Sequence, residues 1–148
     1  RAQVLAQQHR VTYDSPIDTQ SLVKDICNMK QQFTQFGGAR PFGVSILFAG
    51  IDENGERGIP RLFLTDPTGI FFEYKATAIG EAEVEIKEML ENEYKETMDI
   101  DDGIKLGLKA LKKVLGKQYD SSRIDGVYIL NTKKEFTRIT NEKLTKLK

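Results

Sequence analysis

The sequence contains very few of the side chains on which metal binding and nucleophilic catalysis most often depend. Its 148 residues include one histidine, His9, and one cysteine, Cys27. A Ser-His-Asp or Cys-His system would therefore depend on His9 alone, and a structural zinc site normally needs four Cys or His ligands. We accordingly expect no catalytic residue, no metal site and no cofactor in this chain, and a surface role for His9.

The single cysteine also excludes a disulfide bond within the chain, which is typical of proteins from reducing compartments. Cys27 lies beside Ile26 and Met29 in a helical pattern, so we expect a small buried hydrophobic residue rather than a nucleophile. No apolar run approaches the roughly 20 residues that span a bilayer, and no secretory signal opens the sequence. We therefore expect a cytoplasmic protein with no membrane partner.

An excess of charge of either sign is missing as well. Lys and Arg together number 22, as do Asp and Glu, so the formal net charge is zero. Surfaces that bind nucleic acid usually show a basic excess, so we expect no nucleic-acid partner. The hydrophobic content of 39% and the charged content of 30% are typical of a soluble globular protein. The length suits one domain, so we expect residues 1–148 to form a single domain.

What the sequence does contain is a regular order of helical and extended patterns. Good helix formers occupy residues 1–8 without a capping residue before them, so we expect the chain to begin within a helix and its domain to be incomplete at the N-terminus. After a turn at 14–16, an amphipathic helix is predicted over 18–36, ended by Gly37-Gly38. Its expected apolar face consists of Leu22, Val23, Ile26, Met29 and Phe33.

Three short segments with strong β propensity follow this helix. They are residues 44–49, 61–64 and 70–74, and a polar, glycine-containing loop separates the first two. Residues 66–69 read Asp-Pro-Thr-Gly, the order that a type I turn prefers. Because the connections are short, the three strands are predicted to form an antiparallel meander.

Two amphipathic helices are predicted next, over residues 81–96 and 101–115. Gly103 and Gly107 lie four residues apart in the second helix, where they cost helix stability but allow a neighbouring segment to approach closely. The expected apolar faces are Ile86, Met89, Leu90 and Tyr94 in the first helix and Ile104, Leu108, Leu111 and Leu115 in the second.

The chain closes with predicted strands at 127–130 and 136–139 and a short helix after Thr140-Asn141. Residues 44–49 and 127–130 are apolar at nearly every position, as in strands of a sheet that is covered on both faces. Helix pairs that alternate with antiparallel strands predict an α+β fold with four layers, an α/β/β/α sandwich.

Several motifs in the sequence resemble α-type subunits of the 20S proteasome, in particular those of archaea. They include Arg40-Pro41-Phe42-Gly43 and Lys75-Ala76-Thr77-Ala78-Ile79-Gly80. The motifs occur in the family's order and spacing, and the resemblance extends over nearly the whole chain, which is similar to the C-terminal part of such subunits. The matching segments are residues 36–45, 48–52, 60–63, 65–69 and 72–80, with flanking helices at 6–8, 11–13 and 107–111.

The resemblance implies an α/β/β/α sandwich of the N-terminal-nucleophile hydrolase type and a subunit that does not itself cut peptides. In this family, α-type subunits form seven-membered rings that cap the β-type rings, which hold the proteolytic threonines. The α rings gate substrate entry and dock activators. The expected partners are therefore other α-type subunits in a heptameric ring, β-type subunits and an ATPase activator complex. The gate and activator pockets belong to the family's leading segment, so no site residue is carried over.

The alternative is an N-terminal-nucleophile peptidase subunit of β type. Such subunits use a free N-terminal threonine and a late Asp-Ser-x-Ser stretch. Here residues 120–123 read Asp-Ser-Ser-Arg, with Arg123 in place of the second serine, and the first residue is Arg1. These differences favour a non-catalytic subunit and a polar loop at 120–123, whereas an N-terminal Thr in the mature full-length product would favour the peptidase. For the non-catalytic subunit, we expect the helices at 1–9 and 18–36 to make the ring contacts.

Overall fold

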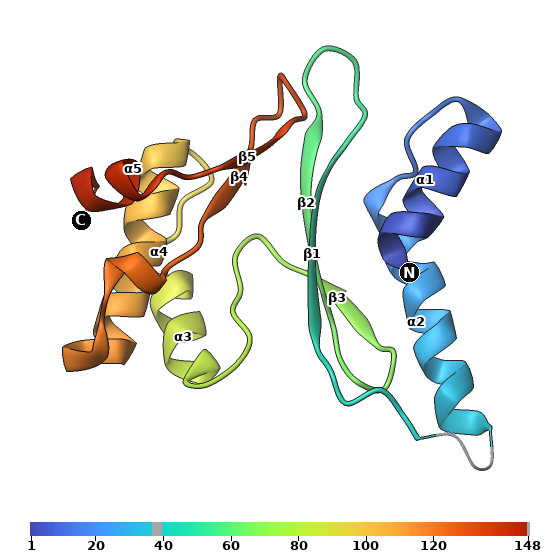
Figure 1. Ribbon diagram of the computed structural model, residues 1–148, viewed down its shortest axis with the longest axis horizontal. Helices are drawn as coiled ribbons and strands as arrows, with labels where there is room; N and C mark the ends of the chain where they lie inside the picture. The colour runs from blue at the N-terminus through green and yellow to red at the C-terminus, as the bar shows by residue number, and fades with distance from the viewer. Residues whose placement is uncertain (37–39, 148) are drawn as a thin grey trace. The chain divides into compact units, whose positions relative to one another are not determined.

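The computed structural model describes residues 1–36 and 40–147 and divides the chain into two compact units, Arg1–Tyr74 and Lys75–Lys148 (Figure 1). Each unit contains helices and an antiparallel sheet of its own, so the expected mixture of helix and strand is confirmed. The expectation of a single domain over residues 1–148 stays a prediction.

The first unit contains two helices followed by three strands, in the predicted order. α1 continues past its expected end near Gln8, and Asp14 closes it in the left-handed conformation with φ of 53°. The elements are α1 (Ala2–Tyr13), α2 (Thr19–Gln35), β1 (Ile46–Asp52), β2 (Ile59–Thr65) and β3 (Phe71–Glu73).

Helix α2 begins where the sequence predicts. The Asp18 carboxylate accepts a hydrogen bond from the Ser21 backbone N–H at 2.9 Å and so caps the helix. The apolar face differs from the expected one, because Met29 is half-buried and Phe33 is 39% exposed, whereas Lys30 is only 2% exposed. The helix gives way to extended backbone at Phe36, and the predicted stop at residues 37–38 lies outside the described residues.

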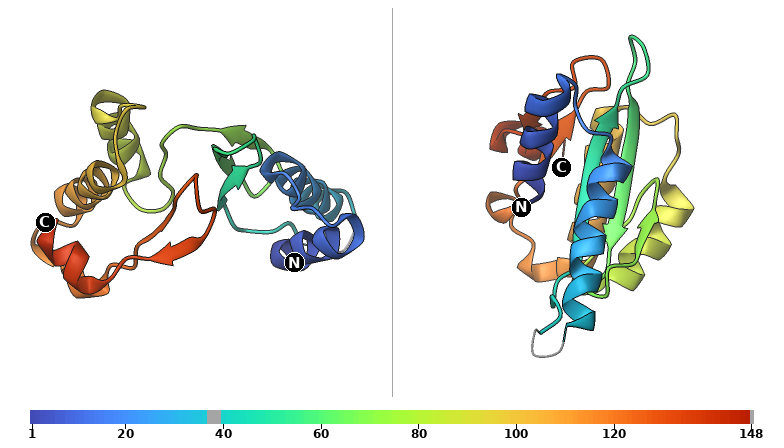
Figure 2. Two further views of the ribbon diagram at one scale, coloured as in Figure 1. Left: turned by 90° about the horizontal axis from the view of Figure 1, so that it is seen from above. Right: turned by 90° about the vertical axis from the view of Figure 1, so that its right-hand side faces the viewer.

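The strands β1, β2 and β3 form the predicted antiparallel meander, with α1 and α2 on one side of it (Figure 2). The α2 face of this sheet carries the core, where Phe63 is 1% exposed and packs with Val23 and Cys27. On the opposite face, Leu47 and Phe72 are 37% and 57% exposed, so this face lacks the burial expected for a covered sheet. The four-layer order of the sandwich stays a prediction.

The second unit confirms the predicted helix pair, the hairpin and the final helix. The first helix starts at Glu83 instead of Glu81, because Ala82 adopts a left-handed conformation directly before it. The elements are α3 (Glu83–Glu93), α4 (Ile100–Leu115), two 3-10 turns (Gly116–Gln118 and Ser121–Arg123), β4 (Val127–Ile129), β5 (Phe136–Arg138) and α5 (Asn141–Lys146).

Helix α3 packs on α4 through its predicted face. The centre of this core is formed by Met89, Leu106 and Ala110. Leu106 and Ala110 do not belong to the apolar face that the sequence predicts for α4. This helix therefore has buried side chains on two of its sides. Its predicted side includes Leu108, which is 5% exposed and lies on a separate groove.

The glycines of α4 do not have the close neighbour expected for them. A Cβ atom on Gly103 or Gly107 would meet no described atom within 4 Å. Both glycines instead line an open groove of about 380 Å³ between α4 and the segment that leads into β4. Within the part of the chain that the structure describes, none of the helices combines the length and apolarity needed to cross a membrane.

Candidate functional site

His9 and Cys27, the two side chains with the greatest catalytic potential, each make contacts that support the fold. The His9 ring stacks obliquely on Tyr13, with centroids 4.6 Å apart, and its Nδ1 lies 3.1 Å from the Ser15 carbonyl oxygen, which closes the end of α1. Cys27 is 2% exposed, as predicted, and burial raises the pKa of its thiol. A buried thiol with a raised pKa is a poor nucleophile.

The predicted polar loop at residues 120–123 contains a short 3-10 turn, Ser121–Arg123, in the connection between α4 and β4. The Asp120 carboxylate accepts a hydrogen bond from the Ser122 backbone N–H at 2.9 Å, so the aspartate caps this turn. Among residues 1–36 and 40–147, no three His, Cys, Asp or Glu side chains gather in a way that could hold a metal ion. The absence of catalytic and metal residues remains a prediction from sequence.

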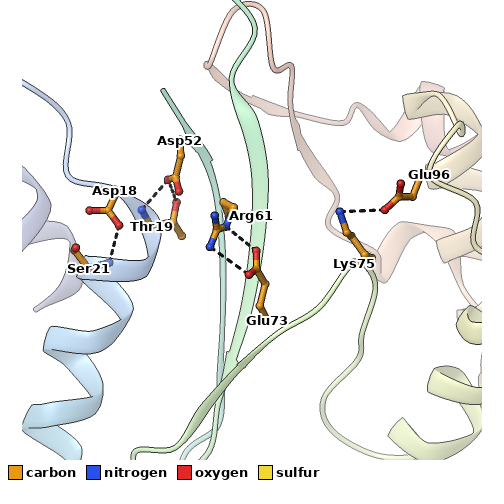
Figure 3. Close-up of polar contacts among 8 residues, drawn as sticks. All are labelled: Asp18, Thr19, Ser21, Asp52, Arg61, Glu73, Lys75 and Glu96. Carbon is orange, nitrogen blue, oxygen red and sulfur yellow. Dashed lines mark hydrogen bonds and ion pairs between the residues drawn. The ribbon is translucent and has the colours of Figure 1, made fainter. Parts of the chain in front are cut away.

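Polar groups do converge where the N-terminus of α2 meets the end of β1 (Figure 3). One oxygen of the Asp52 carboxylate accepts hydrogen bonds from the Thr19 backbone N–H at 2.7 Å and from the Thr19 hydroxyl at 2.6 Å. Asp52 and the capping Asp18 thus place two carboxylates at the positive end of the helix dipole. Side-chain and backbone hydrogen bonds from Ser21 lower the pKa of Asp18.

Gly50 makes the close approach of Thr19 possible. A Cβ atom at residue 50 would lie 2.3 Å from the Thr19 hydroxyl oxygen, so any larger residue would displace that side chain. The sequence gives no sign of this contact, because the two residues are far apart along the chain.

A second polar cluster surrounds the buried ammonium of Lys30, in the C-terminal half of α2. Its Nζ donates to the Val44 carbonyl at 3.0 Å, to the Thr65 hydroxyl at 2.9 Å and to the Asp66 carbonyl at 2.9 Å. The three N–H donors of an ammonium therefore all have acceptors. Burial lowers the pKa of Lys30, because desolvation disfavours its charged form.

The β2–β3 turn lies directly against this part of α2. Its Gly69 N–H bonds to the Asp66 carbonyl, which confirms the predicted turn. The Asp66 carboxylate accepts from the Thr68 hydroxyl at 2.7 Å and from the Ile70 N–H at 3.0 Å. These hydrogen bonds, with that of the Thr68 hydroxyl foremost, lower the pKa of Asp66.

Gly69 is required in this turn for two reasons. Its φ of +91° is rarely adopted by other residues, and a Cβ atom would lie 2.7 Å from the backbone oxygen of Cys27 in α2. The Gln31 side-chain amide also donates to the Gly69 carbonyl at 3.4 Å. Helix α2 is thus attached to the sheet at both ends, through Thr19 at one and Lys30 at the other.

Several further ion pairs connect neighbouring segments within each unit. Arg61 of β2 binds Glu73 of β3 through two contacts, at 2.6 and 3.2 Å (Figure 3). In the second unit, Lys109 of α4 binds Glu93 of α3 at 2.6 Å. Lys75 binds Glu96 at 3.0 Å, with both side chains at least 70% exposed. Exposed pairs of this kind each contribute about 0–1 kcal/mol to the free energy of unfolding. We assign these pairs a minor role in stability and no role in function.

Exposed apolar side chains mark the surfaces that are available for contact. None of the residues in α1 is buried, and Val4, Val11 and Tyr13 are 49%, 86% and 67% exposed. Val4 and Val11 lie on one open groove of this helix. Contiguous apolar surface of this kind often marks protein–protein contacts. The polar clusters described above hold the fold together, so these surfaces are the best candidates for function.

Comparison with known proteins agrees with the motifs. A family model described as "Proteasome subunit" matches residues 1–129. The chain is 42% identical to proteasome subunit alpha of Archaeoglobus fulgidus over 97% of its own length and 56% of the relative's. It is 46% identical to the proteasome subunit alpha of Methanosarcina acetivorans over 90% of its length and 53% of the relative's.

A third relative, the proteasome subunit alpha of Pyrobaculum aerophilum, is 42% identical over 99% of this chain and 58% of its own length. The chain therefore spans a little more than half the length of the curated relatives it matches. The resemblance to archaeal α-type subunits that the motifs indicate is confirmed. Because the family model matches most of its residues, the chain belongs to the proteasome subunit family.

Proposed function

We propose that this chain is the C-terminal part of a non-catalytic α-type subunit of the 20S proteasome core, a threonine-type endopeptidase complex. The observation that carries the proposal is its 42–46% identity, over at least 90% of its length, to archaeal proteins that bear the name proteasome subunit alpha. Arg123, in place of a serine of the β-type motif, supports the same assignment. The complete subunit would act in protein degradation in the cytoplasm.

The subunit would form the outer seven-membered ring with other α-type subunits and would lie on a ring of β-type subunits. That ring would control substrate entry and dock an ATPase activator. The exposed apolar side chains of α1, such as Val4 and Val11, support a role for this helix in packing against neighbouring subunits. The segment before this chain in such a subunit would carry the gate and the activator pockets.

We propose the N-terminal-nucleophile hydrolase fold for the complete subunit, with its four-layer sandwich. The family assignment supports this fold, and the mixture of helices and antiparallel strands agrees with it. The exposed sheet face around Leu47 and Phe72 is apolar, so a second sheet packed on it would bury surface that is now in contact with water.

The assembly state of the complete gene product tests this proposal. Native mass measurement of the purified protein should show seven-membered rings, and co-expression with the β-type subunit should give a four-ring particle. A stable monomer in both experiments would contradict the proposed role.

A peptidase assay separates the proposed subunit from a β-type peptidase. The purified protein alone should not cleave peptides, whereas the assembled particle should, and a threonine-directed inhibitor should block that turnover. Inhibitor-sensitive turnover by the protein alone would establish the peptidase function instead.

A further inference from the structure

The most unusual group outside the candidate surfaces is the ammonium of Lys30. The side chain points into the interface between α2 and the sheet, and the residue is 2% exposed. Its three acceptors come from separate places in the chain. They are the Val44 carbonyl before β1, the Thr65 hydroxyl at the end of β2 and the Asp66 carbonyl in the β2–β3 turn.

These acceptors are neutral oxygens, at distances between 2.9 and 3.0 Å from Nζ. The carboxylate of Asp66 accepts hydrogen bonds inside its own turn, from Thr68 and Ile70. Carbonyl and hydroxyl oxygens are the ligands that replace the hydration shell of a monovalent cation in proteins. The cluster thus has the chemistry of a small cation site whose cation is covalently attached to α2.

The geometry also favours the protonated form of the amine. An ammonium offers three N–H donors, which match three oxygens, whereas a neutral amine has two N–H donors and would turn its lone pair toward the third oxygen. The Thr65 hydroxyl accepts from Lys30 and lies 3.4 Å from the Ile46 carbonyl, to which its own proton is directed. The cation is therefore part of a connected network that links α2, the start of β1 and the end of β2.

We propose that Lys30 serves as a built-in monovalent cation, which occupies the oxygen cage formed by Val44, Thr65 and Asp66 and fixes the β2–β3 turn against α2. The cage is a latent cation site. When the side chain is shortened, the same oxygens bind a free ammonium ion or an ion of similar size and charge.

Rescue of a Lys30→Ala variant tests the proposal, made in the complete subunit. Thermal unfolding is measured in ammonium chloride and in tetramethylammonium chloride at equal ionic strength, because the methylated cation has no N–H donor and is too large for the cage. We expect ammonium to raise the Tm of the variant selectively. Unsubstituted protein should respond equally to both salts, since its cage is occupied.

Hydrogen exchange at the Ile70 amide reports the turn itself. In tetramethylammonium, the Lys30→Ala variant should exchange this proton about tenfold faster than the unsubstituted protein, and ammonium should restore the slower rate. A Lys30→Met variant fills the volume without a charge or a donor. It should show the fast exchange and no response to ammonium.

A double variant, Lys30→Ala with Thr65→Val, removes one cage oxygen and should lose the rescue. Equal Tm values for Lys30→Ala in the two salts would overturn the proposal, as would slow Ile70 exchange in Lys30→Met. If Lys30→Ala fails to fold in tetramethylammonium, its refolding yield is compared between the two salts. A yield that ammonium does not improve would likewise overturn it.

Discussion

Thr19 and Asp52 connect the first turn of α2 to the last residue of β1 through a single carboxylate oxygen, which accepts both the backbone N–H and the hydroxyl of the threonine. Thr19 is 9% exposed, so both donors are shielded from water. An N-terminal helix N–H that lacks an intrahelical partner is thereby satisfied from the neighbouring strand. These two hydrogen bonds fix the position of the first turn of α2 along the sheet.

Removal of this acceptor should destabilise the first unit. An Asp52→Ala variant leaves two shielded donors without a partner, which costs about 1–3 kcal/mol in the free energy of unfolding. Asp52→Asn keeps an acceptor oxygen but loses the charge, so its loss should be smaller. Urea unfolding of the complete subunit gives the values, with the exposed Glu91→Gln as the control for a lost charge. A loss no greater than that of the control would contradict the assigned role.

The contact between Gly50 and Thr19 predicts strong coupling between two substitutions. Gly50→Ala places a methyl group where the Thr19 hydroxyl lies and should cost about 1–3 kcal/mol of stability by overpacking. In a Thr19→Ala background the nearest atom of residue 19 is its Cβ, 3.3 Å from the new methyl group, so the same change should cost much less. A double-mutant cycle measures this difference. Strictly additive losses would show that the two residues do not compete for space.

Helix positions could be predicted from sequence because they depend on local patterns. The Asp18 cap and the hydrophobic spacing that follows it gave the start of α2 correctly. The buried face was partly wrong, since Lys30 follows Ile26 by four residues on the apolar side yet has a charged head. Its acceptors lie 14, 35 and 36 residues away, so no local pattern can indicate that the charge is satisfied. The exposure of the sheet face around Leu47 could not be predicted either. An apolar strand indicates that its side chains tend to be buried, but it does not indicate which segment covers them.

Gly69 and Gly55 form a matched pair that separates backbone strain from close packing. Both have positive φ, but a Cβ on Gly55 would meet no described atom within 4 Å, whereas one on Gly69 would collide with the Cys27 carbonyl. Gly55→Ala should therefore cost only the conformational strain, roughly 1 kcal/mol. Gly69→Ala should cost roughly 1–3 kcal/mol more, because the turn must move away from α2. Urea midpoints provide the comparison, and equal losses would mean that the turn can shift freely.

The buried Lys30 predicts how stability depends on alkaline pH. Its pKa in the folded chain lies below the ordinary lysine value of 10.5, so between these two values the unfolded chain binds more protons than the folded chain. The free energy of unfolding must then rise with pH in that window, as the cost of burying the charge disappears. Cys27 has the opposite sign, because its pKa is raised above 9.0 and its contribution falls at higher pH.

A Lys30→Met substitution isolates the lysine when it is made in a Cys27→Ala background, because the charges of Lys30 and Cys27 shift each other's pKa. The difference in unfolding free energy, Cys27→Ala minus Cys27→Ala with Lys30→Met, should increase as the pH rises through the lowered pKa and level off above 10.5. Urea unfolding at a series of pH values between about 7 and 11 measures this difference, because this range extends from well below the ordinary lysine pKa of about 10.4 to just above it. A difference that decreases over this range would mean that the folded chain holds the Lys30 proton more tightly than the unfolded chain, and that the oxygen cage more than offsets the cost of burial.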